Sequence, residues 1–269
     1  MKAVILAAGK STRTYPLTLT RPKPLLPIAN RPLLARQLDA LAGLVDEVLL
    51  VVGYRQEMIR ERFGDHYRDI RLVYVEQTEQ QGTGHAVLQC APHLNGPALV
   101  LNGDDLYAPE DLRALVATEQ GCLGYEVDDP RRFGVLETKG DRIVRVVEKP
   151  AQPTSNMVSI GAYKFPTGVC EILRTAKPSA RGEIEIVAAM QALADAGGFR
   201  VVRSSGYWLP IGYPWDLIEA NTWWLENRFE ARNEGKVSPA AHLSGPVSVG
   251  PDTAIKPGAV IEGPVIIGE

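Results

Sequence analysis

Apolar runs alternate with amphipathic stretches along the first part of the chain. Runs rich in β-branched residues predict strands that are buried on both faces, at residues 2–8, 47–53, 70–75 and 97–102. An apolar stripe after Asn30-Arg31-Pro32 predicts a helix, with Leu34, Leu38, Leu41 and Val45 on one face. Residues 54–63 also have helical character. This alternation predicts an α/β fold with a Rossmann-like doubly wound sheet, which binds ligands where its parallel strands end.

The middle of the chain has a different pattern, with shorter strands. Antiparallel or mixed strands are predicted at residues 121–127, 133–137, 142–148, 157–165 and 199–205. Helices are predicted at residues 109–118, 167–175, 184–195 and 215 to about 232. The sheet is therefore expected to be mixed, within a domain that spans residues 1–232.

The last part of the chain repeats with a period of six residues. Large aliphatic residues recur at Val237, Leu243, Val249, Ile255, Ile261 and Ile267. This period predicts that residues 237–269 begin a left-handed parallel β-helix, in which these side chains point inward. Because such coils need stacked neighbours, we expect the natural protein to continue beyond residue 269.

Composition narrows the classes of partner. The 269 residues are 45% hydrophobic and 23% charged, with a net charge of −3, which suits one large α/β domain with a small appendage. No basic run is present, which argues against nucleic acid or an anionic membrane as the main partner. No apolar stretch reaches about 18 residues, and the first one stops at Gly9. We therefore expect no membrane span or signal peptide, and we predict a cytoplasmic protein.

Cysteine spacing predicts neither a metal cluster nor a disulfide framework. Cys90, Cys122 and Cys170 are odd in number and widely separated, so we expect small core residues. Among the histidines, only His85 lies inside a motif.

The loop after the first strand has the groups needed to bind a polyphosphate. Its backbone N–H groups are unobstructed at residues 7–9, and the cations Arg13 and Lys23 follow. It is not a Walker A loop, because that motif requires a glycine where this chain has Val4. It is not a dinucleotide fingerprint either, because the next glycine after Gly9 is Gly43.

A longer string carries a specific family resemblance. The signature of the sugar-1-phosphate nucleotidyltransferases, of the UDP- and dTDP-sugar pyrophosphorylase type, closely resembles Leu6-Ala-Ala-Gly-Lys-Ser-Thr-Arg-Thr-Tyr-Pro-Leu-Thr and then Pro22-Lys23-Pro24-Leu25-Leu26-Pro27. The resemblance implies that the nucleotide is bound by Leu6, Ala7, Ala8, Gly9, Lys10, Ser11, Thr12 and Arg13. Ser11 departs from the pattern, which usually has a second glycine there.

The segment after the third strand is expected to read the nucleobase. Gly82 and Gly84 surround Thr83 at a predicted helix start, so a flat base can lie against the backbone, and Gln77 can offer an amide to its edge. A solvated loop amide is the alternative for Gln77. The resemblance of Gly-Thr-Gly-His-Ala to the uridylyl and thymidylyl branches favours a pyrimidine, bound by Gln77, Gly82 and Thr83.

The fourth strand ends in two acids, Asp104 and Asp105. A carboxylate at that edge can hold Mg²⁺ against phosphate oxygens, and Asp104 matches the metal aspartate of the family. We expect Asp105 to cap the following helix or to lie in solvent.

A further motif resembles the family's sugar site. Glu148-Lys149-Pro150 is similar to its Glu-Lys-Pro, in which the acid binds sugar hydroxyls and the lysine binds the phosphate. Gly134 and Gly161 match positions where the backbone approaches the sugar. An alternating strand also exposes Glu and Lys without any function, so this motif draws its meaning from the others.

One position breaks the pattern. The family has Trp-x-Asp-x-Gly-x-Pro, whose aspartate is the second metal ligand, and this chain has Pro210 there. Asp216 is expected in the first turn of the next helix and is not expected to replace it. Pro210 leaves open the alternative of a weakly active or regulatory nucleotide-sugar-binding subunit.

The sequence thus predicts an enzyme that transfers a nucleotidyl group from UTP or dTTP to a sugar 1-phosphate and releases pyrophosphate. Arg13, Lys23 and Asp104 are the predicted catalytic residues, with Mg²⁺ as cofactor. The repeat resembles that of bifunctional N-acetylglucosamine-1-phosphate uridyltransferase-like proteins, where the full β-helix forms trimers and can carry acyltransferase activity. That similarity implies a homo-oligomer.

Overall fold

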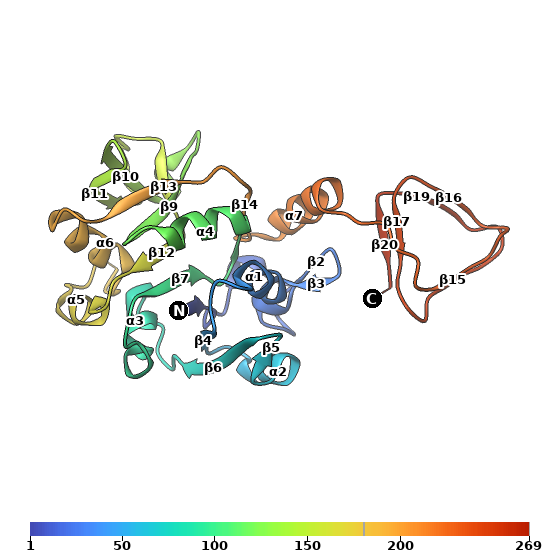
Figure 1. Ribbon diagram of the computed structural model, residues 1–269, viewed down its shortest axis with the longest axis horizontal. Helices are drawn as coiled ribbons and strands as arrows, with labels where there is room; N and C mark the ends of the chain where they lie inside the picture. The colour runs from blue at the N-terminus through green and yellow to red at the C-terminus, as the bar shows by residue number, and fades with distance from the viewer. Residues whose placement is uncertain (180, 269) are drawn as a thin grey trace.

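A ten-stranded mixed sheet forms the centre of the protein, with strand order β10-β11-β13-β9-β12-β7-β1-β4-β6-β5. The computed structural model describes residues 1–179 and 181–268, and Figure 1 shows the sheet with its helices and the short C-terminal strands beyond them. The strands of this sheet are β1 (Lys2–Leu6), β4 (Glu47–Val52), β5 (His66–Tyr67), β6 (Ile70–Glu76), β7 (Ala98–Asn102), β9 (Gly121–Glu126), β10 (Gly134–Lys139), β11 (Arg142–Glu148), β12 (Met157–Phe165) and β13 (Arg200–Arg203).

The sheet has a parallel part and an antiparallel part, as the two strand patterns predict. Strands β7, β1, β4 and β6 are parallel neighbours, so their carboxyl ends meet at one edge. Strand β12 runs antiparallel to β7 and also pairs with β9 and β10. It therefore joins the parallel part of the sheet to the part that contains β10 and β11.

Helices cover both faces of the sheet, which explains why the central strands β1, β4 and β7 are apolar except at their ends. The helices are α1 (Leu33–Leu41), α2 (Gln56–Phe63), α3 (Thr83–Gln89), α4 (Pro109–Ala117), α5 (Val169–Thr175), α6 (Ile186–Asp195) and α7 (Pro214–Asn227). Val4 of β1 packs in the cluster with α3, α5 and α6. Its neighbours Ala3 and Ile5 pack in the cluster with α1, α2 and α4.

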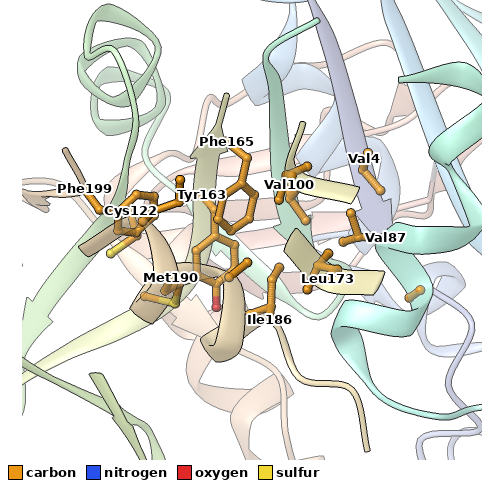
Figure 2. Close-up of a cluster of buried hydrophobic side chains, with 14 of the residues drawn as sticks. Val4, Val87, Val100, Cys122, Tyr163, Phe165, Leu173, Ile186, Met190 and Phe199 are labelled. Atoms are coloured by element: carbon orange, nitrogen blue, oxygen red, sulfur yellow. The ribbon is translucent and has the colours of Figure 1, made fainter. Parts of the chain in front are cut away.

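A column of aromatic rings fills the core beneath the antiparallel part (Figure 2). The ring of Phe165 lies 5.5 Å from that of Tyr163 and 5.7 Å from that of Phe199, stacked in both cases. The three cysteines are also buried, and none forms a disulfide. Their role as small core residues is confirmed, and burial raises the pKa of both the Cys90 and the Cys122 thiols to about 12.

Two of the small sheets outside the main one precede the C-terminal strands in the described part of the chain. Strand β2 (Pro27–Ile28) pairs with β3 (Arg31–Pro32), and β8 (Asp105–Tyr107) pairs with β14 (Trp208–Pro210). The second pair places Pro210 opposite Asp105. The sequence pattern did not predict these strands, because two- or three-residue strands are too short to show a period.

The C-terminal strands stack in register at a spacing of three hexads. They are β15 (Lys236–Val237), β16 (His242–Ser244), β17 (Val247–Val249), β18 (Ala254–Ile255), β19 (Val260–Glu262) and β20 (Val265–Ile267). Parallel pairing sets Val237 beside Ile255, Leu243 beside Ile261, and Val249 beside Ile267. This arrangement is compatible with the start of the predicted β-helix. Residue 269, the last of the predicted repeat, lies outside the described residues.

The last helix is shorter than predicted. Helix α7 ends at Asn227 instead of continuing to about residue 232. Beyond it the backbone bonds to the C-terminal strands, because Val249 N–H donates to Arg232 C=O and Glu234 N–H donates to Val249 C=O. These tertiary hydrogen bonds replace those of a continued helix.

We expect Phe165→Ala to lower the free energy of unfolding by about 3–5 kcal/mol, since it removes a fully buried ring from the aromatic column. Ile218→Ala is the matched control, because Ile218 is 70% exposed and its loss should cost under about 0.5 kcal/mol. Urea denaturation followed by far-UV circular dichroism measures both. Equal losses in the two variants would contradict the packing described.

Candidate active site

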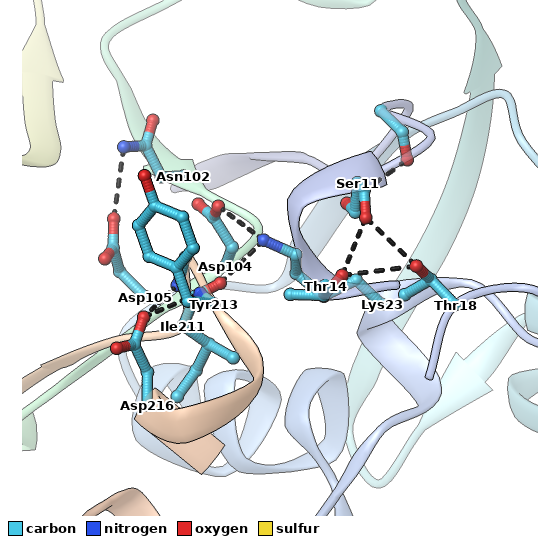
Figure 3. A network of polar contacts seen from close by, with 12 residues as sticks. Ser11, Thr14, Thr18, Lys23, Asn102, Asp104, Asp105, Ile211, Tyr213 and Asp216 are labelled. Carbon is cyan, nitrogen blue, oxygen red and sulfur yellow. Dashed lines mark hydrogen bonds and ion pairs between the residues drawn. The ribbon is translucent and has the colours of Figure 1, made fainter. Parts of the chain in front are cut away.

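The loop after β1 is held in shape by two buried threonines (Figure 3). The hydroxyls of Thr14 and Thr18 both donate to the backbone oxygen of Ser11, at 2.7 and 3.0 Å. Ser11 has φ +53°, in the left-handed region. A glycine adopts this conformation without strain, which explains why the family pattern usually has glycine at this position.

Lys23 joins three segments that are distant in the sequence. Its ammonium group lies 3.0 Å from Oδ2 of Asp104, at the end of β7, and 2.6 Å from the backbone oxygen of Ile211. The Lys23 side chain is only 5% exposed, and that of Asp104 is 37% exposed. The first loop, the end of β7 and the loop before α7 therefore meet at one cation.

Asp105 does not have the role predicted for it. It is buried in β8, accepts hydrogen bonds from Asn102 Nδ2 and Trp208 Nε1, and Ala108 stands at the N-cap of α4. Burial, helped by the negative charge of Asp104, raises the pKa of Asp105 to about 8. The prediction of a helix cap or a solvated acid was wrong, because the pairing of β8 with β14 turns this side chain inward.

A cavity of about 500 Å³ lies against this junction. Of the predicted site residues, it is lined by Leu6, Arg13, Thr83, Asp104, Gly134, Glu148, Lys149 and Gly161. The predicted catalytic and sugar-binding residues therefore come together, although they lie in both halves of the sequence. Because β12 bridges the two halves of the sheet, Gly161 is carried to within reach of Asn102 and Asp105.

The residues that were predicted to bind the sugar phosphate have distinctive local geometry. Gly161 has φ +80°, and a Cβ at this position would collide with the amide of Asn102. Lys149 has φ +46°, in the left-handed region, a strained conformation of the kind that is found at functional sites. Its ammonium group lies 3.2 Å from Oε1 of Glu148, and Arg181 lies 3.9 Å from the same oxygen.

A smaller pocket of about 290 Å³ adjoins the larger cavity. The two share Leu6, Thr83 and Glu183, and the smaller one is also lined by Ala8, Gly9, Gln77, Gln80, Gly82 and Ala86. Gln77 is buried, and its Nε2 lies 3.3 Å from the backbone oxygen of Gly82. It is therefore not the solvated loop amide that was the alternative.

Gly82 is required by close packing as well as by its backbone. It has φ +107°, and a Cβ there would lie 2.5 Å from the backbone oxygen of Ile184. The Thr83 hydroxyl accepts a hydrogen bond from Ile186 N–H at the start of α6. The loop that contains Gly82 and Thr83 is thus fixed against the segment that leads into α6.

Four predicted nucleotide-binding residues do not line either cavity. Ala7 is buried beneath the loop, Lys10 and Thr12 are exposed, and Ser11 is half-buried. Their part in binding stays a prediction.

Several lining residues were missed by the sequence analysis. Arg132 and Arg181 line the larger cavity, and Gln80 Nε2 donates to the backbone oxygen of Ala8 beside the smaller one. Two arginines lie near the ring of Tyr213, whose centroid is 5.3 Å from Cζ of Arg13 and 5.1 Å from Cζ of Arg132. These are loop residues, which have no periodic signal in the sequence.

Position 210 and Asp216 both lie at the cavity. Pro210 lines its wall. Oδ2 of Asp216 accepts hydrogen bonds from the backbone N–H groups of Gly212 and Tyr213, each at 2.7 Å. Asp216 is therefore committed to the start of α7, as expected.

Asp104 is the residue with chemistry suited to a hard cation. Its Oδ1 has no hydrogen-bond partner among the described residues, and no group of three or more His, Cys, Asp or Glu side chains that could hold a metal occurs in residues 1–179 and 181–268. One carboxylate with substrate oxygens and water suits Mg²⁺, which often takes few protein ligands. Separately, none of the described helices is long and apolar enough to cross a bilayer.

Relatives in sequence agree with this geometry. The bifunctional protein GlmU of Methanococcus aeolicus is 39% identical over 260 residues, which are 96% of this chain and 62% of that protein. The UTP–glucose-1-phosphate uridylyltransferase AglF of Haloferax volcanii is 36% identical over 231 residues, which are 82% of this chain and 95% of that protein. The chain thus spans less than two thirds of the length of the GlmU relative.

Solved structures have the same fold. A UDP-glucose pyrophosphorylase complexed with UDP-glucose is similar with a TM-score of 0.76 and 26% identity, over 84% of this chain and 99% of that one. A putative glucose-1-phosphate thymidylyltransferase from Bacillus anthracis gives 0.75 and 27%, over 82% and 94%. The family model described as nucleotidyl transferase matches residues 2–227. The chain, which the family model covers to the end of α7, therefore belongs to the nucleotidyl transferase family.

Proposed function

We propose that this protein transfers a nucleotidyl group from UTP or dTTP to a sugar 1-phosphate and releases pyrophosphate. The observation that carries the proposal is the pair of adjoining cavities, which share Leu6 and Thr83 and have the Lys23–Asp104 pair beside them. The smaller is the size of a nucleobase site, and the larger suits a sugar phosphate. The similarity to AglF and to the two pyrophosphorylase-type structures supports the same reaction.

The chain's own residues would act on charge and position. Arg13 and Lys23 would balance the charge of the phosphates during in-line attack of the sugar phosphate on the α-phosphorus. Lys149 would bind the sugar phosphate, and Glu148 would accept hydrogen bonds from the sugar hydroxyls. Both pairs, Lys23–Asp104 and Lys149–Glu148, would exchange partners when substrates enter. No covalent enzyme intermediate is needed.

The residues present fit a magnesium ion held chiefly by Asp104. When bound, Mg²⁺ would supply positive charge that offsets the triphosphate. Asp105 is not part of this proposal, because it is buried and its oxygens accept hydrogen bonds from neighbouring side chains. Pro210 has no ligand atom in its side chain, so the substrate and water would complete the coordination.

The base-side pocket supports a pyrimidine nucleotide. The Gln77 amide and the backbone of Gly82 line this pocket, where the amide can meet the edge of a base. We propose UTP or dTTP as the substrate on this basis. The alternative of a regulatory subunit without turnover, which Pro210 left open, gains no support from the relatives.

We further propose a two-unit organisation, with the nucleotidyltransferase unit at residues 1–232 and the repeat unit at residues 237–269. Stacked repeats leave unpaired strand edges at their ends. A continued β-helix that joins several copies of the chain would cover such surfaces.

Arg13→Ala and Lys23→Ala are each expected to lower kcat by about 10²- to 10³-fold, the usual loss when one preorganised charge is removed. Pyrophosphate release measures the rate, and thermal denaturation checks that each variant folds. Arg113→Ala on the exposed side of α4 is the control and should keep its rate. A folded variant with near-normal turnover would remove that residue from the mechanism.

The rate with UTP or dTTP is expected to exceed the rate with GTP or ATP by about 10-fold or more, because a mismatched base leaves buried polar groups unpaired. Pyrophosphate release over a matrix of the four nucleotides and several sugar 1-phosphates measures the preference. Gln77→Ala should reduce the preference for the pyrimidine nucleotides. Gln56→Ala should leave that preference unchanged, because Gln56 is on α2 and does not line the pocket. Equal rates with all nucleotides would exclude the pyrimidine assignment.

Pro210→Asp is expected to lower the Mg²⁺ concentration for half-maximal rate and to raise kcat. The reason is that it places a second carboxylate on the wall that contains Asp104. A Mg²⁺ titration of both proteins at saturating nucleotide is the measurement, and Pro210→Ala controls for loss of the proline ring. An unchanged metal dependence in a folded variant would show that position 210 does not face the metal.

A further inference from the structure

A second large cavity, of about 720 Å³, lies between the catalytic body and the C-terminal strands. Its walls come from the β2–β3 hairpin, α1, the end of α2, the end of α7 and the segments around β17 and β20. It shares no lining residue with the catalytic cavity. The reaction proposed above therefore leaves this cavity without a use.

Arginines dominate the lining of this cavity, which we call the arginine pocket. They are Arg31, Arg36, Arg62, Arg68, Arg228 and Arg232. Among the described residues, the acids that line the pocket are Glu230 and Glu234, so this part of the wall carries a formal excess of four positive charges, whereas the whole chain has a net charge of −3. The fold thus concentrates positive charge at one place on an acidic protein.

Nearby acids neutralise only part of this charge. Asp39 pairs with Arg31 at 2.9 Å and with Arg68 at 2.8 Å, and Glu110 lies 3.7 Å from Arg228. With both acids counted, arginines still exceed carboxylates by two. Arg62 is exposed and has no ion pair or hydrogen bond from its side chain to the described residues.

One arginine is built into the base of the pocket. Arg36 is buried, and its Nε and Nη2 donate to the backbone oxygens of Ile28 and Ala29 at 2.7 and 3.0 Å. Its Cζ lies 3.6 Å from the centroid of the Trp224 ring. Burial and the charge of Arg31 lower the pKa of Arg36 to about 10, which keeps the guanidinium charged at neutral pH. The fold therefore retains a buried cation that has no carboxylate at hydrogen-bond distance among the described residues.

We propose that the arginine pocket binds a small metabolite that carries two or more phosphate-type negative charges, at a site separate from the catalytic one. Guanidinium groups match phosphate oxygens with two parallel hydrogen bonds each. Arginines from several elements facing one cavity are the arrangement that such an anion requires, and the volume suits a phosphorylated small molecule.

The position of the pocket gives the bound anion a structural consequence. Arg232 precedes the C-terminal strands, Arg62 belongs to α2, and Asn30 Nδ2 already donates to the backbone oxygen of Gly268 at 2.8 Å. An anion bridging these groups would fasten the repeat segment to the catalytic body. It would also contact α1, whose Gln37 donates to the backbone oxygens of Asn102 and Asp105 beside the catalytic junction.

The test measures binding of inorganic tripolyphosphate by isothermal titration calorimetry. The parent protein is the Arg13→Ala, Lys149→Ala variant, whose catalytic cavity has lost two exposed cations, so the result does not depend on turnover. Arg62→Gln and Arg232→Gln are each expected to weaken the affinity of this parent about tenfold or more, since each removes a charge-assisted hydrogen-bond donor. Arg113→Gln is the matched control, because Arg113 is an exposed arginine on α4 that lines none of the described cavities.

The outcomes separate cleanly. Saturable binding that both pocket variants weaken and the control does not supports the site. No saturable binding to the parent, equal affinity in all variants, or an equal loss in Arg113→Gln would overturn it. Thermal denaturation checks each variant, and because the two substitutions lie on different elements, one folded variant is enough to decide. If the protein turns over no sugar phosphate, this test still applies, because it measures binding and not the rate of a reaction.

Discussion

The buried ammonium group of Lys23 is the contact on which the arrangement of the active site depends. It links Asp104 at the end of β7 to the backbone of Ile211 before α7, and both bonds cross long intervals of sequence. A buried ammonium group requires partners, because leaving it unpaired in a low-dielectric interior is costly. The first loop, the Asp104 edge and the Ile211 loop are therefore held together by the same requirement, and the larger cavity opens beside them.

The sheet explains why residues from both halves of the chain reach this junction. Parallel strands bring the ends of β1 and β7 to one edge, and β12 then crosses antiparallel to β7. Gly161 in β12 is forced to be glycine by the amide of Asn102 at the end of β7. Close approach of the β12 backbone to the Asn102 side chain at this point gives the cavity one wall from each half. The glycines at 82 and 161 are thus packing constraints as well as parts of a motif.

The acids near the junction have different roles because their surroundings differ. Asp104 is partly exposed and paired with Lys23, whereas its neighbour Asp105 is buried in β8 with a raised pKa. Asp216 accepts hydrogen bonds from the backbone N–H groups of Gly212 and Tyr213, just before α7. These three carboxylates, which all line the larger cavity, therefore differ in exposure and in hydrogen bonding. The charge of the protein is likewise uneven, since the arginine pocket gathers cations on a chain that is acidic overall.

The sequence by itself determined the alternation of strands and helices, the six-residue repeat and the motif residues of the loop after β1. These follow from local rules: periodicity of burial, turn chemistry and the spacing of charges. Only the tertiary structure decided that Asp105 is buried, that α7 ends at Asn227, and that Arg132, Arg181 and Tyr213 line the larger cavity. Each of these depends on a partner distant in the chain, such as Trp208 for Asp105 and Val249 for the segment after α7. Local patterns do not encode such partners, because a two- or three-residue strand pairing or a loop arginine has no period to read.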